Sequence, residues 1–298
     1  MDTQRLGRSD IEVGRIAYGC WRLAGPDAAA PGAVAEAHTK IETALDCGMT
    51  LIDTADIYGR GGPGFGTAEE LLGRTLAASP SLRDRMVIAT KGGIAAGVPY
   101  DSSAAYLRTA CEASLRRLGI DVIDLYQVHR PDLLAHPAEV AGILTELRES
   151  GKVRELGVSN YSASQRAALQ AHLGDVPLAT IQPELSLLRH DPIDDGVLDG
   201  AMATGLTPLV WSPLAGGRIA GSELQDPLAA ELDALAERES VTRSAIALAW
   251  VMAHPSGAIP IIGTQRPDRI REAATAATVR LTKADWYTLL AAAGRHLP

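Results

Sequence analysis

Short apolar runs rich in β-branched side chains alternate with longer helical stretches about eight times along the chain. The apolar runs suit strands, and the stretches between them carry Ala, Leu and Glu at helical spacing, as over 102–119 and 137–151. Gly119 and Gly151 stand where these two helices would end, a position that favours a left-handed residue. The predicted strands cover residues 15–20, 50–53, 86–91, 123–129, 154–160, 178–184, 206–212 and 258–264.

This alternation predicts parallel strands joined by crossover helices, either in an open doubly wound sheet or in a closed barrel. The number of near-regular units favours the barrel, as does the lack of a G-x-G-x-x-G turn after the first strand. We therefore predict an α/β fold, a (β/α)8 TIM barrel, with residues 1–298 as a single domain. Residues 6–13 predict an N-terminal β-hairpin over one barrel end, and 267–277 and 282–294 predict extra C-terminal helices.

Composition narrows the class of protein. With 46% hydrophobic and 21% charged residues, the chain resembles an ordinary globular protein with an ample core. A net charge of −8 and the lack of a Lys/Arg block argue against a nucleic-acid partner. No apolar run is long enough for a bilayer and no signal peptide is visible, so we expect no membrane partner and a cytoplasmic protein. Cys20, Cys47 and Cys111 form neither a metal-ligand spacing nor a disulfide framework.

Polar side chains stand just past most of the apolar runs. In a parallel barrel the carboxyl ends of all strands meet on one face, where active sites are found. One polar residue there would mean little, but this many at equivalent positions suggest a common site. These residues are Asp53, Lys91, His129, Ser159, Asn160, Gln182, Trp211, Ser212 and Thr264.

The segments around these residues resemble the successive landmarks of the aldo-keto reductases, and are more similar to the bacterial branches than to the hydroxysteroid and aldose reductases. The resemblance spans nearly the whole chain, in order. It implies NADPH-dependent reduction of an aldehyde or ketone, a small-molecule substrate, in a (β/α)8 barrel without a Rossmann domain. The matching segments are LIDTADIYG, IATKGG, DLYQVHRPD, GVSNYS, IQPELSLL, WSPLAGG and PIIGTQRPDRI.

The resemblance assigns a catalytic tetrad to Asp53, Tyr58, Lys91 and His129. Hydride arriving at a carbonyl carbon leaves negative charge on the oxygen, so a positioned proton donor lowers the barrier. Tyr58 would be that donor, and its ordinary pKa of about 10 would be lowered by the Lys91 ammonium. Asp53 would hold Lys91 by a charge-assisted hydrogen bond, and His129 would orient the carbonyl oxygen.

Plainer roles exist for each of these residues alone: a turn cap for Asp53, packing for Tyr58, a solvated strand end for Lys91, and a structural hydrogen bond in a loop for His129. Their order and their places at successive strand ends favour the tetrad. A metal site formed by Asp53, Asp56 and His129 is disfavoured because Lys91 would put a positive charge beside the ion, and we expect none. Asp56, like Thr54, is expected only to shape the turn.

The resemblance also implies contacts to NADPH or NADP. Ser159 and Asn160 would bind the nicotinamide carboxamide with Gln182 beside them, and Trp211 would stack on the ring. Ser212, Leu214 and Gly216 would begin the loop that covers the pyrophosphate.

At the adenosine end, Thr264 and Arg269 match positions that contact the 2′-phosphate, and Arg266 would assist. Gly263 stands where many members have lysine and Ala273 where many have asparagine. These departures weaken the preference for NADP without reversing it.

The mouth of the barrel is expected to be open, because little chain follows the last predicted helix. Its predicted substrate-binding rim consists of Trp21, Arg22, Phe65, Tyr100 and Arg130, with a glycine-rich loop, 59–66, after Tyr58. Two other functions stay open: a nicotinamide-binding regulatory subunit with little turnover, as in the potassium-channel β subunits, and an unrelated barrel lyase or isomerase. The sequence predicts neither the physiological substrate nor the oligomeric state.

Overall fold

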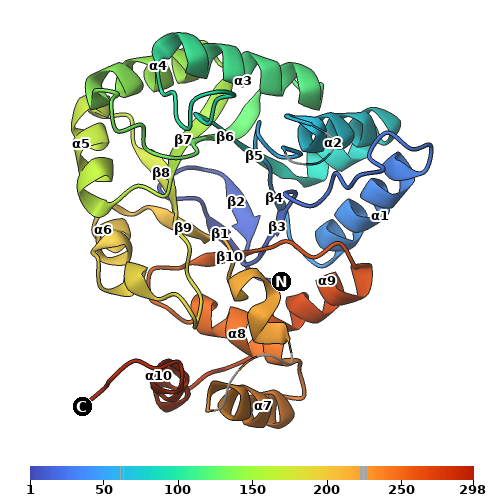
Figure 1. The fold of residues 1–298 in the computed structure, drawn as a ribbon, viewed down its shortest axis with the longest axis vertical. Coiled ribbons are helices and arrows are strands. Elements are labelled where there is room, and N and C mark those ends of the chain that lie inside the picture. The colour runs from blue at the N-terminus through green and yellow to red at the C-terminus, as the bar shows by residue number, and fades with distance from the viewer. Residues whose placement is uncertain (61, 63, 222–223, 225–226) are drawn as a thin grey trace.

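The strands form a closed parallel barrel in the order β10-β3-β4-β5-β6-β7-β8-β9 (Figure 1). The structure is a computed structural model that describes residues 1–60, 62, 64–221, 224 and 227–298. All eight predicted strands and the predicted (β/α)8 fold are confirmed. The strands are β3 (Ala17–Gly19), β4 (Leu51–Asp53), β5 (Val87–Gly92), β6 (Ile123–Val128), β7 (Val153–Ser159), β8 (Leu178–Gln182), β9 (Thr207–Val210) and β10 (Ile259–Ile262).

Helices surround the barrel on its outside (Figure 1). The α9 helix packs against α1 and α8 and so completes the ring, whereas α10 lies outside it against α7. Both predicted C-terminal helices are therefore present, but only α10 is additional to the ring. The helices are α1 (Ala33–Asp46), α2 (Thr67–Ala78), α3 (Ala104–Leu118), α4 (Pro137–Glu149), α5 (Ala163–Leu173), α6 (Val197–Thr204), α7 (Leu228–Glu239), α8 (Arg243–Met252), α9 (Pro267–Ala274) and α10 (Lys283–Ala292), with 3-10 turns η1 (Pro80–Arg85), η2 (Asp191–Ile193), η3 (Ala215–Ala220) and η4 (Thr275–Thr278).

The predicted N-terminal hairpin is confirmed: β1 (Thr3–Arg5) pairs antiparallel with β2 (Glu12–Gly14). Leu6, Ile11 and Val13 of the hairpin are buried against apolar side chains of the barrel strands. These partners are Ala17, Leu51, Ala89, Leu125, Leu209, Ile259 and Ile261. Because most of them lie at or near the start of their strand, the hairpin closes the amino end of the barrel and leaves the carboxyl ends for a site.

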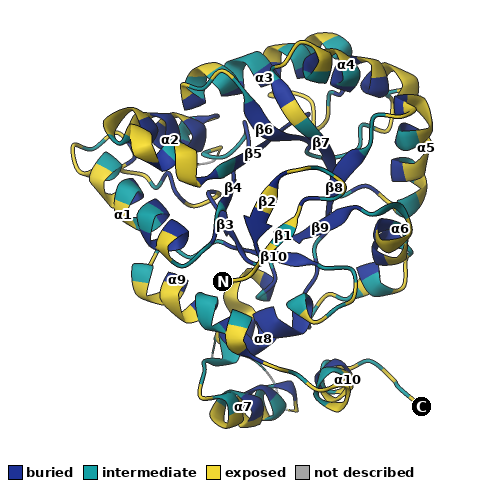
Figure 2. Cartoon of the chain, turned by 180° about the vertical axis from the view of Figure 1, so that it is seen from behind, coloured by how far each residue is buried: buried dark blue, intermediate teal, exposed yellow. Residues whose placement is uncertain are grey.

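The barrel strands are buried almost throughout, while most helices are buried on one side only (Figure 2). The α8 helix is the exception, because every residue from Ala245 to Val251 is buried. Strands buried on both faces read as nearly continuous apolar runs, which explains why periodicity located them. Polar residues interrupt these runs near the carboxyl ends. Buried polar groups need hydrogen-bond partners, so these positions mark an organised polar network. They include Asp53, Lys91, Gln127, Ser159, Thr180 and Gln182.

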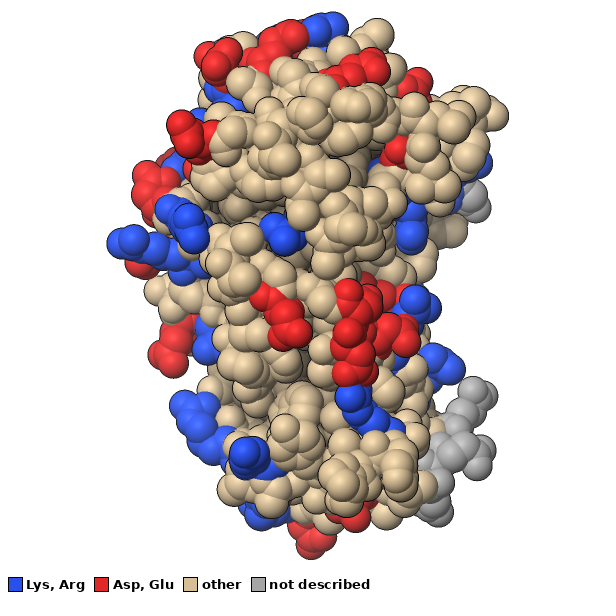
Figure 3. Space-filling model, turned by 90° about the vertical axis from the view of Figure 1, so that its left-hand side faces the viewer, with Lys and Arg blue, Asp and Glu red and all other residues tan. Residues whose placement is uncertain are grey.

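The surface charge is mixed. On the face that carries α5 and α6, Lys and Arg of the described residues are scattered among Asp and Glu (Figure 3). That face therefore offers no continuous basic surface of the kind that binds a nucleic-acid backbone. Among the described residues, no helix combines the length and the apolar character needed to cross a membrane.

Candidate active site

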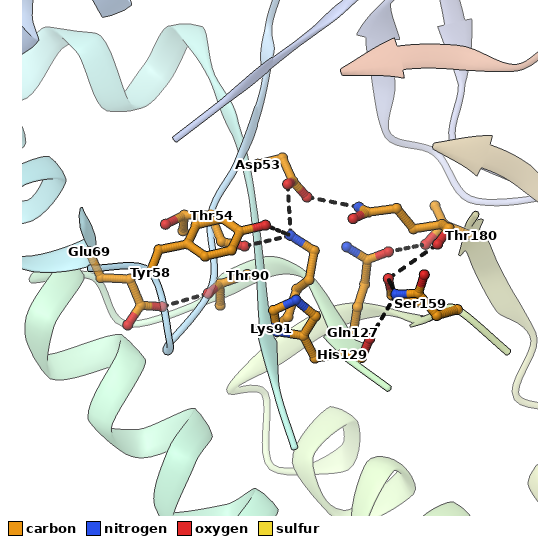
Figure 4. A network of polar contacts seen from close by, with 12 residues as sticks. Asp53, Thr54, Tyr58, Glu69, Thr90, Lys91, Gln127, His129, Ser159 and Thr180 are labelled. Carbon is orange, nitrogen blue, oxygen red and sulfur yellow. Dashed lines mark hydrogen bonds and ion pairs between the residues drawn. The ribbon is translucent and has the colours of Figure 1, made fainter. Parts of the chain in front are cut away.

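The four residues of the predicted tetrad lie together at the carboxyl end of the barrel (Figure 4). Asp53 ends β4, Lys91 lies near the end of β5, His129 follows β6, and Tyr58 stands in the turn after Asp53. Lys91 Nζ donates to Asp53 Oδ2 at 2.7 Å and to Tyr58 Oη at 3.2 Å. The Tyr58 and His129 rings meet edge to face, with their centroids 5.9 Å apart. The predicted tetrad thus has direct contacts between its members.

Lys91 is fully buried and also donates to the carbonyl oxygen of Thr54 at 2.8 Å. Burial alone would lower the pKa of Lys91, but the carboxylate of Asp53 and the Tyr58 hydroxyl raise the pKa by more, so that it lies above its ordinary value. Lys91 is therefore an ammonium ion that stands where a metal bound to Asp53 would have to sit.

Tyr58 has a pKa above its ordinary value, because burial opposes ionisation more strongly than Lys91 favours it. The sequence-based expectation that Lys91 would bring this pKa below its ordinary value is therefore wrong. Lys91 still acts in the expected direction, by its charge and by its hydrogen bond, against the larger effect of desolvation. Tyr58 is consequently a protonated phenol, the form that a proton donor needs.

His129 is a neutral imidazole. Burial, together with the positive charges of Lys91 and Arg130, holds the pKa of His129 well below its usual range. Its Nδ1 is buried without a hydrogen-bond partner among the described residues. A neutral imidazole offers one N–H donor and one acceptor, so His129 can direct a hydrogen bond at an oxygen without bringing a second cation beside Lys91.

The residues predicted to hold the nicotinamide form a connected set of hydrogen bonds beside the tetrad. Asn160 Nδ2 donates to Ser159 Oγ at 2.8 Å and to the His129 carbonyl at 3.2 Å. Trp211 Nε1 donates to Asn160 Oδ1 at 3.0 Å, which fixes the indole over this side of the barrel mouth. Asn160 adopts a left-handed backbone (φ 60°), which asparagine tolerates better than most residues.

Gln182 connects this set to the tetrad. Its Nε2 donates to Asp53 Oδ1 at 2.9 Å, so each carboxylate oxygen of Asp53 has its own donor. Sequence analysis placed Gln182 only beside the cofactor and missed this contact, as it missed the hydrogen bond from Lys91 to the Thr54 carbonyl. Both depend on how distant strands meet when the barrel closes.

The loop after β9, where the pyrophosphate-covering segment is predicted, contains several residues with a left-handed backbone. Ser212 and Ala215 have φ values of 52° and 51°, and Gly216 has a φ of 71°. Successive turns of this kind create concave surfaces of backbone N–H groups that suit anions. Space around Gly216 is open, since an added Cβ would meet nothing within 4 Å, so its need for glycine is conformational. Leu214 packs part-buried on the core and anchors the loop.

The segment predicted to bind the 2′-phosphate lies between β10 and α9. Gly263 and Thr264 follow the strand, and Thr264 Oγ1 accepts a hydrogen bond from the Arg266 amide at 3.3 Å. The Arg266 side chain is exposed and forms an ion pair with Asp268. Arg269 is exposed in the first turn of α9 and forms no ion pair with any carboxylate of the described ranges. Arg269 is thus the guanidinium available to an added anion.

Aromatic and apolar side chains are exposed in the loops at the barrel mouth, as the predicted rim requires. Trp21 after β3 is 61% exposed and Arg22 lies 5.2 Å from its ring centroid. Phe65 and Tyr100 are also exposed, and Arg130 is half-buried. In the predicted loop 59–66, positions 61 and 63 lie outside the described residues.

Sequence analysis did not single out an exposed apolar pair in a loop at the same end of the barrel. Leu133 and Leu134, in the loop after β6, are 77% and 98% exposed. The signal was a pair of leucines in the loop sequence RPDLLAHP, outside any helical periodicity.

Comparison with known proteins identifies the family. The description Aldo/keto reductase family matches residues 15–293, and the chain belongs to this family, as its motifs predicted. It is 53% identical to the 6-dehydroglucose reductase of Novosphingobium aromaticivorans, over 99% of this chain and 97% of that protein. It is 39% identical to the 6-dehydroglucose reductase of Agrobacterium fabrum, over 96% of each chain.

Solved structures agree with this assignment. A thermostable aldo-keto reductase solved with the inhibitor epalrestat superposes with a TM-score of 0.85 at 26% identity, covering 98% of this chain and 99% of that one. The glycerol dehydrogenase of Gluconobacter oxydans superposes with a TM-score of 0.84 at 30% identity, covering 100% of this chain and 96% of that one.

Proposed function

We propose that the chain catalyses NADPH-dependent reduction of an aldehyde or ketone to an alcohol, with Tyr58 as the general acid. The supporting observation is that Lys91, held by Asp53, donates to Tyr58 Oη at 3.2 Å. NADPH, when bound, supplies the hydride. Residues of the chain then bind and orient the carbonyl and move one proton to its oxygen.

The proton step follows from the charges in the site. As negative charge develops on the carbonyl oxygen, the Tyr58 hydroxyl donates its proton and becomes a phenolate. Lys91 stabilises this phenolate, and Asp53 stops Lys91 from losing its proton or turning away. His129, neutral at pH 7, donates a second hydrogen bond to the same oxygen and fixes its position. In alcohol oxidation the phenolate of Tyr58 accepts the proton.

The proposed substrate is an aldehyde on a sugar. Two relatives carry the name 6-dehydroglucose reductase, which denotes a hexose oxidised to an aldehyde at its sixth carbon. The barrel mouth suits such a molecule, since exposed Trp21 and Tyr100 offer flat apolar faces for the C–H side of a sugar ring. Arg22, which lies over the Trp21 ring, and Arg130, in the loop after β6, offer donors for its hydroxyl groups.

The proposed cofactor preference is NADPH over NADH. Ser159, Asn160 and Gln182 would hold the carboxamide of the nicotinamide, Trp211 its ring, and the loop from Ser212 through Leu214 to Gly216 its pyrophosphate. Arg269 would pair with the 2′-phosphate because its guanidinium is exposed and forms no ion pair with a carboxylate of the described residues, and Gly263 and Thr264 would let the phosphate approach.

One experiment tests the proposed function. The purified protein is titrated with NADPH by fluorescence and then given 6-dehydroglucose and a panel of simple aldehydes, in parallel with a Tyr58→Phe variant. We expect binding by both proteins and turnover only by the wild type. Binding without turnover on any carbonyl would instead indicate a regulatory subunit, and no binding of either nicotinamide would indicate an unrelated barrel enzyme.

A further inference from the structure

Asp56 is a buried carboxyl group beside the proposed proton donor. It lies between Asp53 and Tyr58 in the turn after β4 and is 1% exposed. Its backbone N–H donates to the carbonyl oxygen of Lys91 at 3.0 Å, which ties the turn to β5. Neither carboxyl oxygen of Asp56 has a hydrogen-bond partner of good geometry among the described residues, although the Ile57 amide and the Tyr106 hydroxyl are close enough to interact with it weakly. A buried carboxylate without partners is costly, so the group needs a physical explanation.

The nearby cations are committed to other carboxylates. Lys91 is bound to Asp53. On the other side, Glu69 of α2 is fully buried and accepts from Thr90 Oγ1 at 2.5 Å and from Arg117 Nε of α3 at 2.7 Å. Glu69 is thus satisfied by its own cation, and Asp56 is the carboxyl group left without one.

The remaining titratable groups near Asp56 supply no positive charge. They are Tyr106 of α3 and Tyr126 of β6, both neutral phenols because burial raises their pKa values. The Tyr106 hydroxyl already donates its proton to the carbonyl oxygen of Ile94 at 2.7 Å. Burial, and next the charge of Glu69, accordingly raise the pKa of Asp56 to about 8, and Arg117 and Lys91 offset this only in part.

We propose that Asp56 is a positioning residue that works as a neutral carboxylic acid behind Tyr58, and that loss of its proton displaces the turn that carries Tyr58 and lowers turnover in both directions. This inference rests on the proposed function. The turn is short, and the Lys91 contacts to Thr54, Asp56 and Tyr58 hold it in place. A new charge on Asp56 beside Glu69 is relieved by movement towards water, which takes Tyr58 away from Lys91 and His129.

The pH dependence of reduction and of oxidation, measured separately, distinguishes this effect from the ionisation of Tyr58 itself. Ionisation of Tyr58 would remove the acid needed for reduction and supply the base needed for oxidation, so the two rates would change oppositely with pH. Displacement of Tyr58 by ionised Asp56 lowers both rates over the same pH range.

The kinetic test compares the wild type with Asp56→Asn, which cannot ionise, and Glu70→Gln, which loses an exposed carboxylate one residue from Glu69. The kcat/KM for 4-nitrobenzaldehyde with NADPH and for 4-nitrobenzyl alcohol with NADP is measured from pH 6 to 10. Divided by the value for Asp56→Asn at the same pH, both wild-type values should fall about tenfold per pH unit above pH 8, the slope of a single ionisation, and Glu70→Gln should match the wild type. The division removes the ionisation of Tyr58, which both proteins share and which by itself favours oxidation at higher pH. A ratio that stays constant with pH in either direction would overturn the proposal.

Thermal stability can be measured without turnover, so it tests the inference independently of the proposed function. A carboxyl group whose pKa is raised in the folded state binds its proton more tightly there than when unfolded. The wild type should therefore lose stability, relative to Asp56→Asn, as pH rises from about 4 to about 8, and no further above that. A constant difference in Tm between the two proteins would mean that Asp56 has only a structural role, even if the chain reduces carbonyls.

A second variant covers the case in which Asp56→Asn does not fold. Glu69→Gln removes the like charge and frees Arg117, so that Asp56 ionises more easily. Relative to the wild type at the same pH, both rates should then begin to fall below pH 8. A decline at an unchanged or higher pH would contradict the assignment to Asp56.

Discussion

Gln182 on β8 donates its amide N–H to Asp53 Oδ1 on β4 at 2.9 Å, across the interior of the barrel. Lys91 binds the other carboxylate oxygen at 2.7 Å. The Asp53 carboxylate is thereby held between two donors, one from each side. A contact between strands on opposite sides of the barrel thus fixes the direction in which Asp53 presents its charge to Lys91.

Replacing Gln182 by methionine should lower kcat about ten- to a hundredfold, because a buried carboxylate oxygen loses its donor at a cost of about 1–3 kcal/mol. The measurement is kcat together with the Kd for NADPH. Gln127→Met is the matched control, since Gln127 is buried in the same barrel and bonds to Thr180 rather than to Asp53. A large rise in the Kd for NADPH with an unchanged kcat would mean that Gln182 acts only on the cofactor.

Tyr58→Phe should reduce kcat about a hundred- to ten-thousandfold, the usual contribution of a positioned general acid. Binding of NADPH should persist, because the ring remains and only the hydroxyl oxygen is lost. Tyr287→Phe removes the same atom from an exposed residue of α10 and should behave like the wild type. Near-normal reduction of an aldehyde by Tyr58→Phe would show that another group donates the proton.

Arg269→Ala should weaken NADPH binding about ten- to a hundredfold and leave NADH binding nearly unchanged, because only NADPH carries the dianion proposed to face this guanidinium. Fluorescence titration with both nucleotides gives the two Kd values. Arg271→Ala, an exposed arginine on the same helix, serves as the control. An equal effect of Arg269→Ala on both nucleotides would remove the assignment.

Two glycine substitutions should change stability in opposite directions. Gly7 has a φ of 57°, and an added Cβ would lie 2.5 Å from the Ala179 carbonyl oxygen, so Gly7→Ala should lower the free energy of unfolding by about 1–3 kcal/mol. Gly142 lies inside α4 with open space around it, so Gly142→Ala should raise this free energy by about 0.5–1 kcal/mol. Urea unfolding measures both, and a loss of stability in Gly142→Ala would show a contact that the structure lacks.

The sequence was enough to predict the barrel and to group the tetrad. Strands buried on both faces appear as apolar runs, and parallel strands bring their carboxyl ends together, so Asp53, Lys91 and His129 were predicted as neighbours. Two properties could not be predicted in this way. The contact from Gln182 to Asp53 joins residues 129 positions apart and depends on the closed barrel. The raised pKa of Tyr58 depends on burial, which a motif does not encode.

The charge state of Asp56 is a further property that the sequence could not predict. In sequence it is one of two carboxylates in a polar turn, and a solvated turn was the reasonable interpretation. Its environment is set by α2 and α3, which bring Glu69 and Arg117 against it and shut out water. Local patterns predict where a side chain stands along the chain, whereas its charge state follows from everything that later packs around it.

The hairpin fills the amino end of the barrel with Leu6, Ile11 and Val13, and it therefore also limits the routes by which ligands can enter and leave the site. In the proposed function the nicotinamide and the carbonyl compound would then share one entrance, and we expect the nucleotide to enter first and leave last. A second substrate molecule that arrives before the spent nucleotide has left would hold it in place. We therefore expect high concentrations of aldehyde to slow turnover, with inhibition by NADP competitive towards NADPH and noncompetitive towards the aldehyde.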